Sequence, residues 1–159
     1  MPSTMPPDTD ALLATLAREI AAMPPLAAMG VSVHGYDDAC LVLAAPLSLN
    51  VNDKGCAFGG SINSLATIAA WGLAWLALAT RGLEADTFVQ DSTIRYLAPL
   101  YGDLHARARL AGGDWDGFAD QLAARGRARA VIEATLATAE GTPAAVFNGR
   151  FVAIRRTAG

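Results

Sequence analysis

Residues 52–61 (NDKGCAFGGS) join a polar, glycine-containing loop to an apolar stretch that carries no charged residue until Arg81. This junction indicates a loop that ends where a buried helix begins. The first N–H groups of a helix have no intrahelical partner and carry a partial positive charge. Glycine lets a substrate approach the backbone closely. Gly59 and Gly60 at such a helix start therefore predict a site that polarises a carbonyl group or binds an anion.

Polar side chains surround this glycine pair. Asn52 and Asp53 could position or activate water, or they could instead order the loop, as these residue types often do. Ser61 and Ser64 fall in the first helical turn, where they could bond a substrate or serve only as helix-start residues. A serine nucleophile is not expected, because neither histidine sits in a motif that indicates a triad. Cys56 shows no basic partner by spacing and is not expected to be a nucleophile.

Length and composition fit one globular domain of 159 residues, with 53% hydrophobic and 17% charged residues. The net charge of −3 offers no global reason to bind nucleic acid, although a local basic face is possible. Two cysteines and two histidines are too few for a disulfide framework or a metal site, and no cofactor is expected. We expect a disordered segment over 1–8, a single domain with an N-terminal helix over 9–156, and, because no secretory signal is visible, a cytoplasmic protein.

The first half of the chain predicts two helices and two strands. Capping residues at 8–10 and helical spacing predict a helix that prolines at 24–25 end. Strands are predicted around 31–33 and 40–43, with a hairpin turn at 35–38. The loop 46–58 then leads into a helix that ends near residue 80. This helix is apolar all round, but polar and small residues in its first third favour a buried core helix over a membrane span.

The second half changes to a period of two. Strands are predicted over 87–97, 104–110, 127–139 and 144–154, with an insertion at 112–126 that holds a short helix around 118–124. Strands in an unbroken run favour an antiparallel sheet. The fold class is therefore α+β, with a curved antiparallel sheet wrapped around one long central helix and a second subunit covering what the sheet leaves open.

Two blocks carry a resemblance to a known family. Residues 50–61 (NVNDKGCAFGGS) and 91–103 (DSTIRYLAPLYGD) resemble the YiiD-type C-terminal hotdog domain, a thioesterase group, and the resemblance covers roughly 26–156. It implies a hotdog fold and a homodimer or higher oligomer, with two sheets joined edge to edge and sites at the interface. It also implies acyl-CoA or acyl carrier protein thioesters as substrates, polarised by backbone N–H groups near Gly59 and Gly60. Phe58, Ser61 and Ser64 are then substrate-binding candidates.

The chain departs from the pattern of many active relatives. They carry His-Gly-Gly where this sequence has Phe58 before its glycines, and their catalytic acid lies nine residues further on, at the position of Thr67. Asn52 matches a position that binds the nucleophilic water in some relatives. The resemblance thus leaves Asp53 as the nearest replacement carboxylate, with Asp91 as a second if a partner subunit brings it close.

These observations lead to acyl-thioester hydrolysis as the predicted function, with Asn52 positioning water and Asp53 as base. One alternative is a dehydratase or acyltransferase accessory, which the absence of a loop histidine weakens. Another is a non-catalytic acyl-thioester binding module or accessory protein of fatty-acid metabolism, which the missing histidine and helix carboxylate favour. Neither a nucleic acid nor a membrane is an expected partner.

Alternation places several arginines on outward faces of strands. Arg107 and Arg109 share one strand, Arg127 and Arg129 another, and pairing of these strands would gather four guanidinium groups that could hold a coenzyme A nucleotide or an acidic carrier protein. The simpler interpretation is a solvated face or a subunit contact. His105 is expected to face outward, and the two tryptophans at 71 and 75 are expected in the core or an interface rather than around a cofactor.

Overall fold

The computed structural model describes residues 8–157, and the predicted disorder of 1–8 falls outside this range except for its last residue. The order of elements follows the sequence prediction closely. The helices are α1 (Thr9–Ala21), α2 (Pro24–Met29), α3 (Gly59–Ala79) and α4 (Trp115–Arg125), with a short 3-10 helix at Leu47–Leu49. The strands are β1 (Ser32–Asp37), β2 (Cys40–Ala45), β3 (Ala85–Tyr96), β4 (Leu104–Leu110), β5 (Arg127–Ala137) and β6 (Pro143–Arg155).

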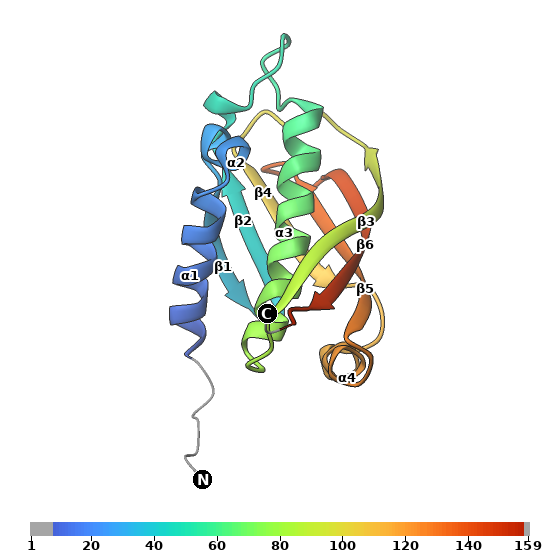
Figure 1. Ribbon diagram of the computed structural model, residues 1–159. Coiled ribbons are helices and arrows are strands. Elements are labelled where there is room, and N and C mark those ends of the chain that lie inside the picture. Colours follow the sequence, from blue (N-terminus) through green and yellow to red (C-terminus); the bar gives the residue numbers. More distant parts are fainter. Residues whose placement is uncertain (1–7, 158–159) are drawn as a thin grey trace.

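All six strands form one antiparallel sheet in the order β1-β2-β4-β5-β6-β3. The sheet curves around α3, as Figure 1 shows, and this confirms the predicted α+β fold with its central helix. Small inward-facing residues on the middle strands let the helix lie close to the sheet. These fully or almost fully buried positions include Ala106, Ala108, Ala128, Ala130 and Ala134.

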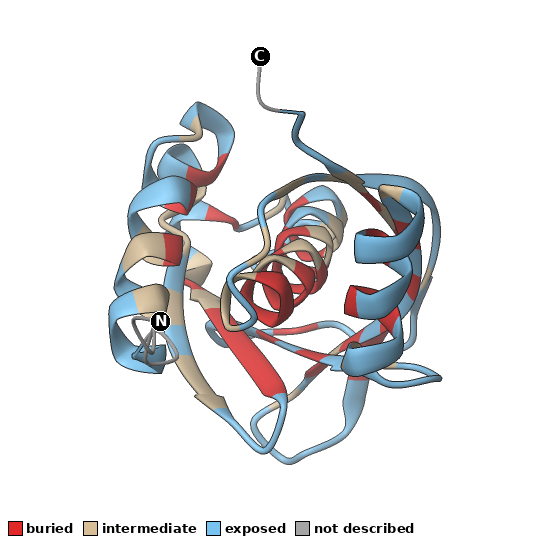
Figure 2. Ribbon diagram, turned by 60° about the horizontal axis from the view of Figure 1, so that its bottom comes forward, coloured by how far each residue is buried: buried red, intermediate tan, exposed pale blue. Residues whose placement is uncertain are grey.

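Helix α3 is apolar on nearly every side because nearly every side is covered. It contacts strands β2 to β6 and helices α1 and α4, and Figure 2 shows its buried residues enclosed by the sheet. By length and composition alone it could cross a membrane, yet 67% of its most apolar window is buried inside the protein. One face stays open, at residues 59, 60, 63, 64, 67, 71, 75 and 79, which are exposed or half-buried.

Two local predictions are corrected by the structure. The hairpin turn predicted at 35–38 is wrong, because β1 runs on through Gly35 to Asp37 and the turn is made by Asp38 and Ala39. Both turn residues have positive φ, at 50° and 56°, the backbone of a two-residue hairpin that matches strand twist. The prolines at 24–25 end α1 but also begin α2, since proline suits the first turn of a helix.

Candidate active site

Asn50 anchors the loop that precedes α3. Its side chain is 3% exposed, and its Nδ2 donates to the carbonyl oxygens of Met29 at 2.9 Å and Pro46 at 2.8 Å. Its backbone oxygen accepts the N–H of Phe58 at 2.7 Å. The side-chain amide of Asn50 thus fixes where the loop begins, and its backbone carbonyl fixes Phe58, the residue just before the helix.

Asn52 orders the tip of the same loop. Its Oδ1 accepts the N–H groups of Lys54 at 2.8 Å and Cys56 at 3.2 Å, and its Nδ2 donates to Cys56 Sγ at 3.2 Å. This arrangement is the local turn that asparagine favours, and it encloses the thiol, which is 8% exposed. The structure therefore shows a loop-ordering role for Asn52; its predicted role in positioning water stays a prediction.

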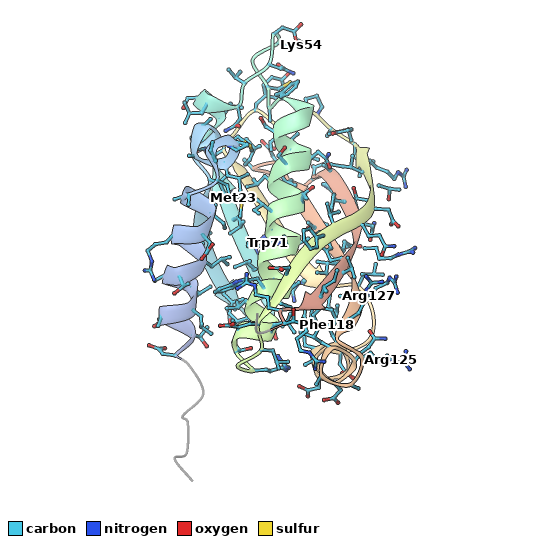
Figure 3. The ribbon with its side chains drawn as sticks, in the orientation of Figure 1. Met23, Lys54, Trp71, Phe118, Arg125 and Arg127 are labelled. Atoms are coloured by element: carbon cyan, nitrogen blue, oxygen red, sulfur yellow. The ribbon has the colours of Figure 1, made fainter. Side chains whose placement is uncertain are left out.

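Asp53 lies at the loop tip and pairs with its neighbour. Its carboxylate is 2.9 Å from Lys54 Nζ, and both side chains are largely exposed. Figure 3 shows Lys54 projecting beyond the first turn of α3. The Asp53 carboxylate makes no hydrogen bond to the glycine pair, so its predicted role as base rests on its place in the loop.

The glycine pair occupies the first two positions of α3, as the sequence predicted. The helix starts after Phe58, whose side chain cannot accept a capping hydrogen bond. Within residues 8–157, the N–H groups of Gly59, Gly60 and Ser61 have no hydrogen-bond acceptor. Gly60 is exposed and Gly59 half-buried, so their two donors can meet an oxygen atom from outside the fold.

Tyr96 contacts the glycine pair, although it was not named as a site residue from the sequence. Its hydroxyl donates to the carbonyl oxygen of Gly59 at 2.9 Å, and its side chain is 53% exposed. A Cβ on Gly59 would lie 3.4 Å from the Tyr96 ring, whereas a Cβ on Gly60 would lie 2.6 Å from the ring of Phe58. The absence of side chains at these two positions therefore lets two exposed aromatic rings pack directly against the backbone of the glycine pair.

The loop that follows β3 is hydrogen-bonded to the loop that precedes α3. Ala57 donates its N–H to Leu100 O at 2.8 Å, and Leu47 donates its N–H to Asp103 Oδ1 at 2.9 Å. The Gly-Asp turn that follows β3 is thereby tied to the loop before α3. These bonds explain structurally why the two resemblance blocks lie together in space.

Comparison with known proteins decides the family. The sequence model described as "Putative thioesterase (yiiD_Cterm)" matches residues 11–155. This chain belongs to that family. A structure from Shewanella oneidensis, described as a "putative thioesterase", is 28% identical, with a TM-score of 0.83 over 91% of this chain and 99% of its own.

Two further structures share the fold at different degrees of sequence identity. A Chlorobaculum tepidum protein of unknown function is 29% identical, with a TM-score of 0.86 over 93% of this chain and 97% of its own. A thioesterase from Haemophilus influenzae is 16% identical, with a TM-score of 0.69 over 90% of each chain. The latter shares the fold, which agrees with the hotdog architecture described above.

The polar residues in the first turns of α3 lie on different faces of the helix. Ser64 is exposed on the open face, whereas Ser61 is buried. The Oδ1 atom of Asn63 is buried without a partner among residues 8–157. Thr67, at the position of the carboxylate in many relatives, donates its hydroxyl to Asn63 O at 2.8 Å and cannot act as a base.

The structure places the remaining candidates, Asp91 and His105, away from the glycine pair. Asp91 lies 3.7 Å from Arg150 in an exposed ion pair. On β6, Arg150 alternates with the fully buried Phe147, Phe151 and Ala153, so this pair lies on the outer face of the sheet, away from α3. His105 is exposed as predicted and stacks edge-on against His34, with ring centroids 4.8 Å apart.

The predicted patch of four arginines is wrong. Strands β4 and β5 do pair, but Arg107 lies opposite Thr135 and Arg109 opposite Glu133. Arg127 lies six residues before Glu133 on β5, a separation of about 20 Å at the rise of a strand. Alternation correctly placed all four side chains outward, but the register of the pair keeps them in two separate groups.

Proposed function

We propose that this chain is a cytoplasmic acyl-thioester hydrolase of fatty-acid metabolism that acts on acyl-CoA or acyl carrier protein thioesters. The observation that carries the proposal is the pair of N–H groups at Gly59 and Gly60, which have no acceptor among residues 8–157 and lie at an accessible helix start beside two exposed aromatic rings. Membership of a thioesterase family supports the same chemistry. Donors fixed at a helix start need no reorganisation when charge develops on a bound carbonyl oxygen.

The proposed reaction uses these two donors and the loop carboxylate. The thioester carbonyl oxygen accepts the Gly59 and Gly60 N–H groups, and water attacks the carbonyl carbon while Asp53 takes its proton. The tetrahedral intermediate then breaks its C–S bond, and the thiolate takes the proton back from Asp53, leaving a carboxylic acid and a free thiol. The exposed ion pair with Lys54 is worth only about 0–1 kcal/mol, so it does not prevent Asp53 from turning toward a bound substrate.

Replacement of Asp53 by asparagine tests the base. We expect kcat for thiol release from acyl-CoA esters to fall by about 10²–10⁴-fold, the range of a lost general base. Asp120→Asn makes the same chemical change at an exposed position on α4 and should leave kcat unchanged. Full turnover in Asp53→Asn would remove Asp53 from the reaction and require another proton acceptor.

The proposed enzyme is a homodimer joined through β3. This strand is an edge of the sheet, with partner β6 on one side only. Its residues are mostly exposed, and they include Phe88, Val89 and Tyr96 at 55%, 44% and 53% exposure. A long edge strand that exposes several apolar side chains is a template for pairing with another strand, and a second copy supplies an identical edge.

Sedimentation analysis tests this assembly. The chain should sediment as a dimer, and Val89→Lys should sediment as a monomer because a lysine at an edge opposes strand pairing. Val131→Lys is a matched control, since Val131 is 45% exposed on a central strand. A parent chain that sediments as a monomer at micromolar concentration would contradict the dimer.

One observation favours the alternative of a non-catalytic binding module. Among the described residues, no carboxylate or imidazole contacts Gly59 or Gly60, and the Thr67 hydroxyl is already engaged by the backbone. Calorimetric titration with a non-hydrolysable acyl-CoA thioether separates the two functions. Tight binding without any thiol release from the matching thioester would support the module.

A further inference from the structure

A cavity of about 510 Å³ opens beside the second half of α3, between α1 and the start of β3. This volume lies within the range of small-molecule sites. Its apolar wall consists of Leu12, Trp71, Trp75, Leu78, Leu83 and Phe88. The cavity is separate from the glycine pair, because Trp71 lies eleven residues, or about 16 Å of helix, beyond Gly60.

The aromatic part of this wall is held in place before any ligand arrives. Trp71 donates its indole N–H to the carbonyl oxygen of Thr87 at 2.9 Å, which ties the ring to β3. Trp75 follows one helical turn later and is also half-buried. One tethered indole with a second indole a turn away suits an apolar group, because little freedom of the tethered ring is lost when the group binds.

The rim of the cavity is acidic. Glu19, Glu84 and Asp86 line it together with a single cation, Arg156. Asp86 accepts a hydrogen bond from Arg156 Nε at 2.9 Å and raises the pKa of that guanidinium, and the charges of Glu84 and Glu19 raise this pKa further. Three carboxylates around one guanidinium leave the rim net negative, which disfavours a ligand carboxylate.

The proposed dimer would bring this cavity close to the glycine pair of the other copy. Antiparallel self-pairing of β3 in the homodimer would set the Tyr96 end of one strand beside the Ala85 end of the other. Tyr96 contacts Gly59, and Ala85 lines the cavity. The glycine pair of one copy then faces the cavity of the other.

We propose that this cavity binds the uncharged, apolar end of the acyl group and selects against acyl groups that end in a carboxylate. The proposal rests on the proposed function for the identity of the ligand. The indole wall contacts the apolar tail, and the acidic rim disfavours a tail that ends in a carboxylate. The substrate class is thus thioesters of monocarboxylic acids with an aliphatic or aromatic tail.

Tryptophan fluorescence tests this without any turnover. The chain has three tryptophans, so Trp115→Phe on α4 leaves only the two in the cavity wall as reporters. The probes are three non-hydrolysable thioethers of equal reach: S-decyl-CoA, S-(10-aminodecyl)-CoA and S-(9-carboxynonyl)-CoA. We expect quenching by the decyl probe at the lowest concentration, then the ammonium probe, with the carboxylate probe at least tenfold weaker than the decyl probe.

Two variants locate the effect. Ala79→Phe fills the cavity and should abolish quenching by S-decyl-CoA, whereas Ala124→Phe adds the same ring to an exposed position on α4 and should not. Glu84→Gln should narrow the gap between the ammonium and carboxylate probes. A carboxylate probe that binds as tightly as the ammonium probe, or an Ala79→Phe variant that still shows full quenching, would overturn the proposal.

Quenching by free decan-1-ol tests binding in the cavity independently of thioester recognition. Quenching by decan-1-ol that Ala79→Phe abolishes, together with no binding of S-decyl-CoA, would support the apolar cavity and contradict thioester recognition. Absence of quenching by both probes would overturn the cavity proposal, whatever the hydrolysis assay shows.

Discussion

Replacing Gly59 with proline should lower kcat for thioester hydrolysis by about 10²–10³-fold, the cost of removing one donor to a developing oxyanion. The change deletes the Gly59 N–H, which has no acceptor within residues 8–157. Proline is well tolerated at the first helical position. The preceding residue, Phe58, already has φ −66° and ψ 130°, an extended conformation that a following proline permits. Activity should therefore fall while α3 remains intact.

Gly59→Ala is the matched control for this variant. It keeps the N–H, and its Cβ would meet the Tyr96 ring at 3.4 Å, close to an ordinary contact. Its kcat should stay well above that of Gly59→Pro, and thermal melts of both variants should match the parent within a few degrees. Equal kcat in the proline variant and the parent would show that the Gly59 N–H does not bind the reacting carbonyl.

Replacing Asn50 with alanine should lower the free energy of unfolding by roughly 1–3 kcal/mol, the cost of one unsatisfied buried group. The carbonyl oxygens of Met29 and Pro46 would lose their common donor, and among residues 8–157 only the Pro46 oxygen keeps a second one, the N–H of Leu49 at 3.3 Å. Asn50→Asp should be worse, since it sets a carboxylate against these two carbonyl oxygens. Urea denaturation measures both variants.

Asn148→Ala provides the comparison, because Asn148 is exposed on β6 and should change stability by less than about 0.5 kcal/mol. An Asn50→Ala variant as stable as Asn148→Ala would mean that the two carbonyls find other donors. The same variant should also lose activity, because the two side-chain bonds that hold the Asn50 backbone in place, and with it the carbonyl that accepts the Phe58 N–H, are lost.

The long helix and the sheet were predictable because their signals are local. A charge-free run of helix formers ends at Arg81 and Gly82, and period-two alternation marks the later strands. The hairpin turn was misplaced because Gly35 looks like a turn residue, while the positive φ values fall on Asp38 and Ala39. Nothing in the preferences of alanine signals that backbone.

The candidate site was predictable only in part, for a related reason. Gly59 and Gly60 could be placed at a helix start from sequence, and the structure puts them there. The contact of Tyr96 with Gly59 joins residues 37 apart along the chain, which no local pattern encodes. The arginine patch was predicted wrongly for a similar reason, because alternation gives the face of a strand but not its register with the neighbouring strand.

Thiol release from a panel of acyl-CoA and acyl carrier protein thioesters tests the proposed hydrolysis at the glycine pair. The parent, Gly59→Pro and Gly59→Ala should be assayed side by side across short, long and aromatic acyl groups. We expect turnover by the parent, a loss of about 10²–10³-fold in Gly59→Pro, and a much smaller loss in Gly59→Ala. No thiol release by the parent from any of these thioesters would contradict hydrolysis and leave the binding module as the better description.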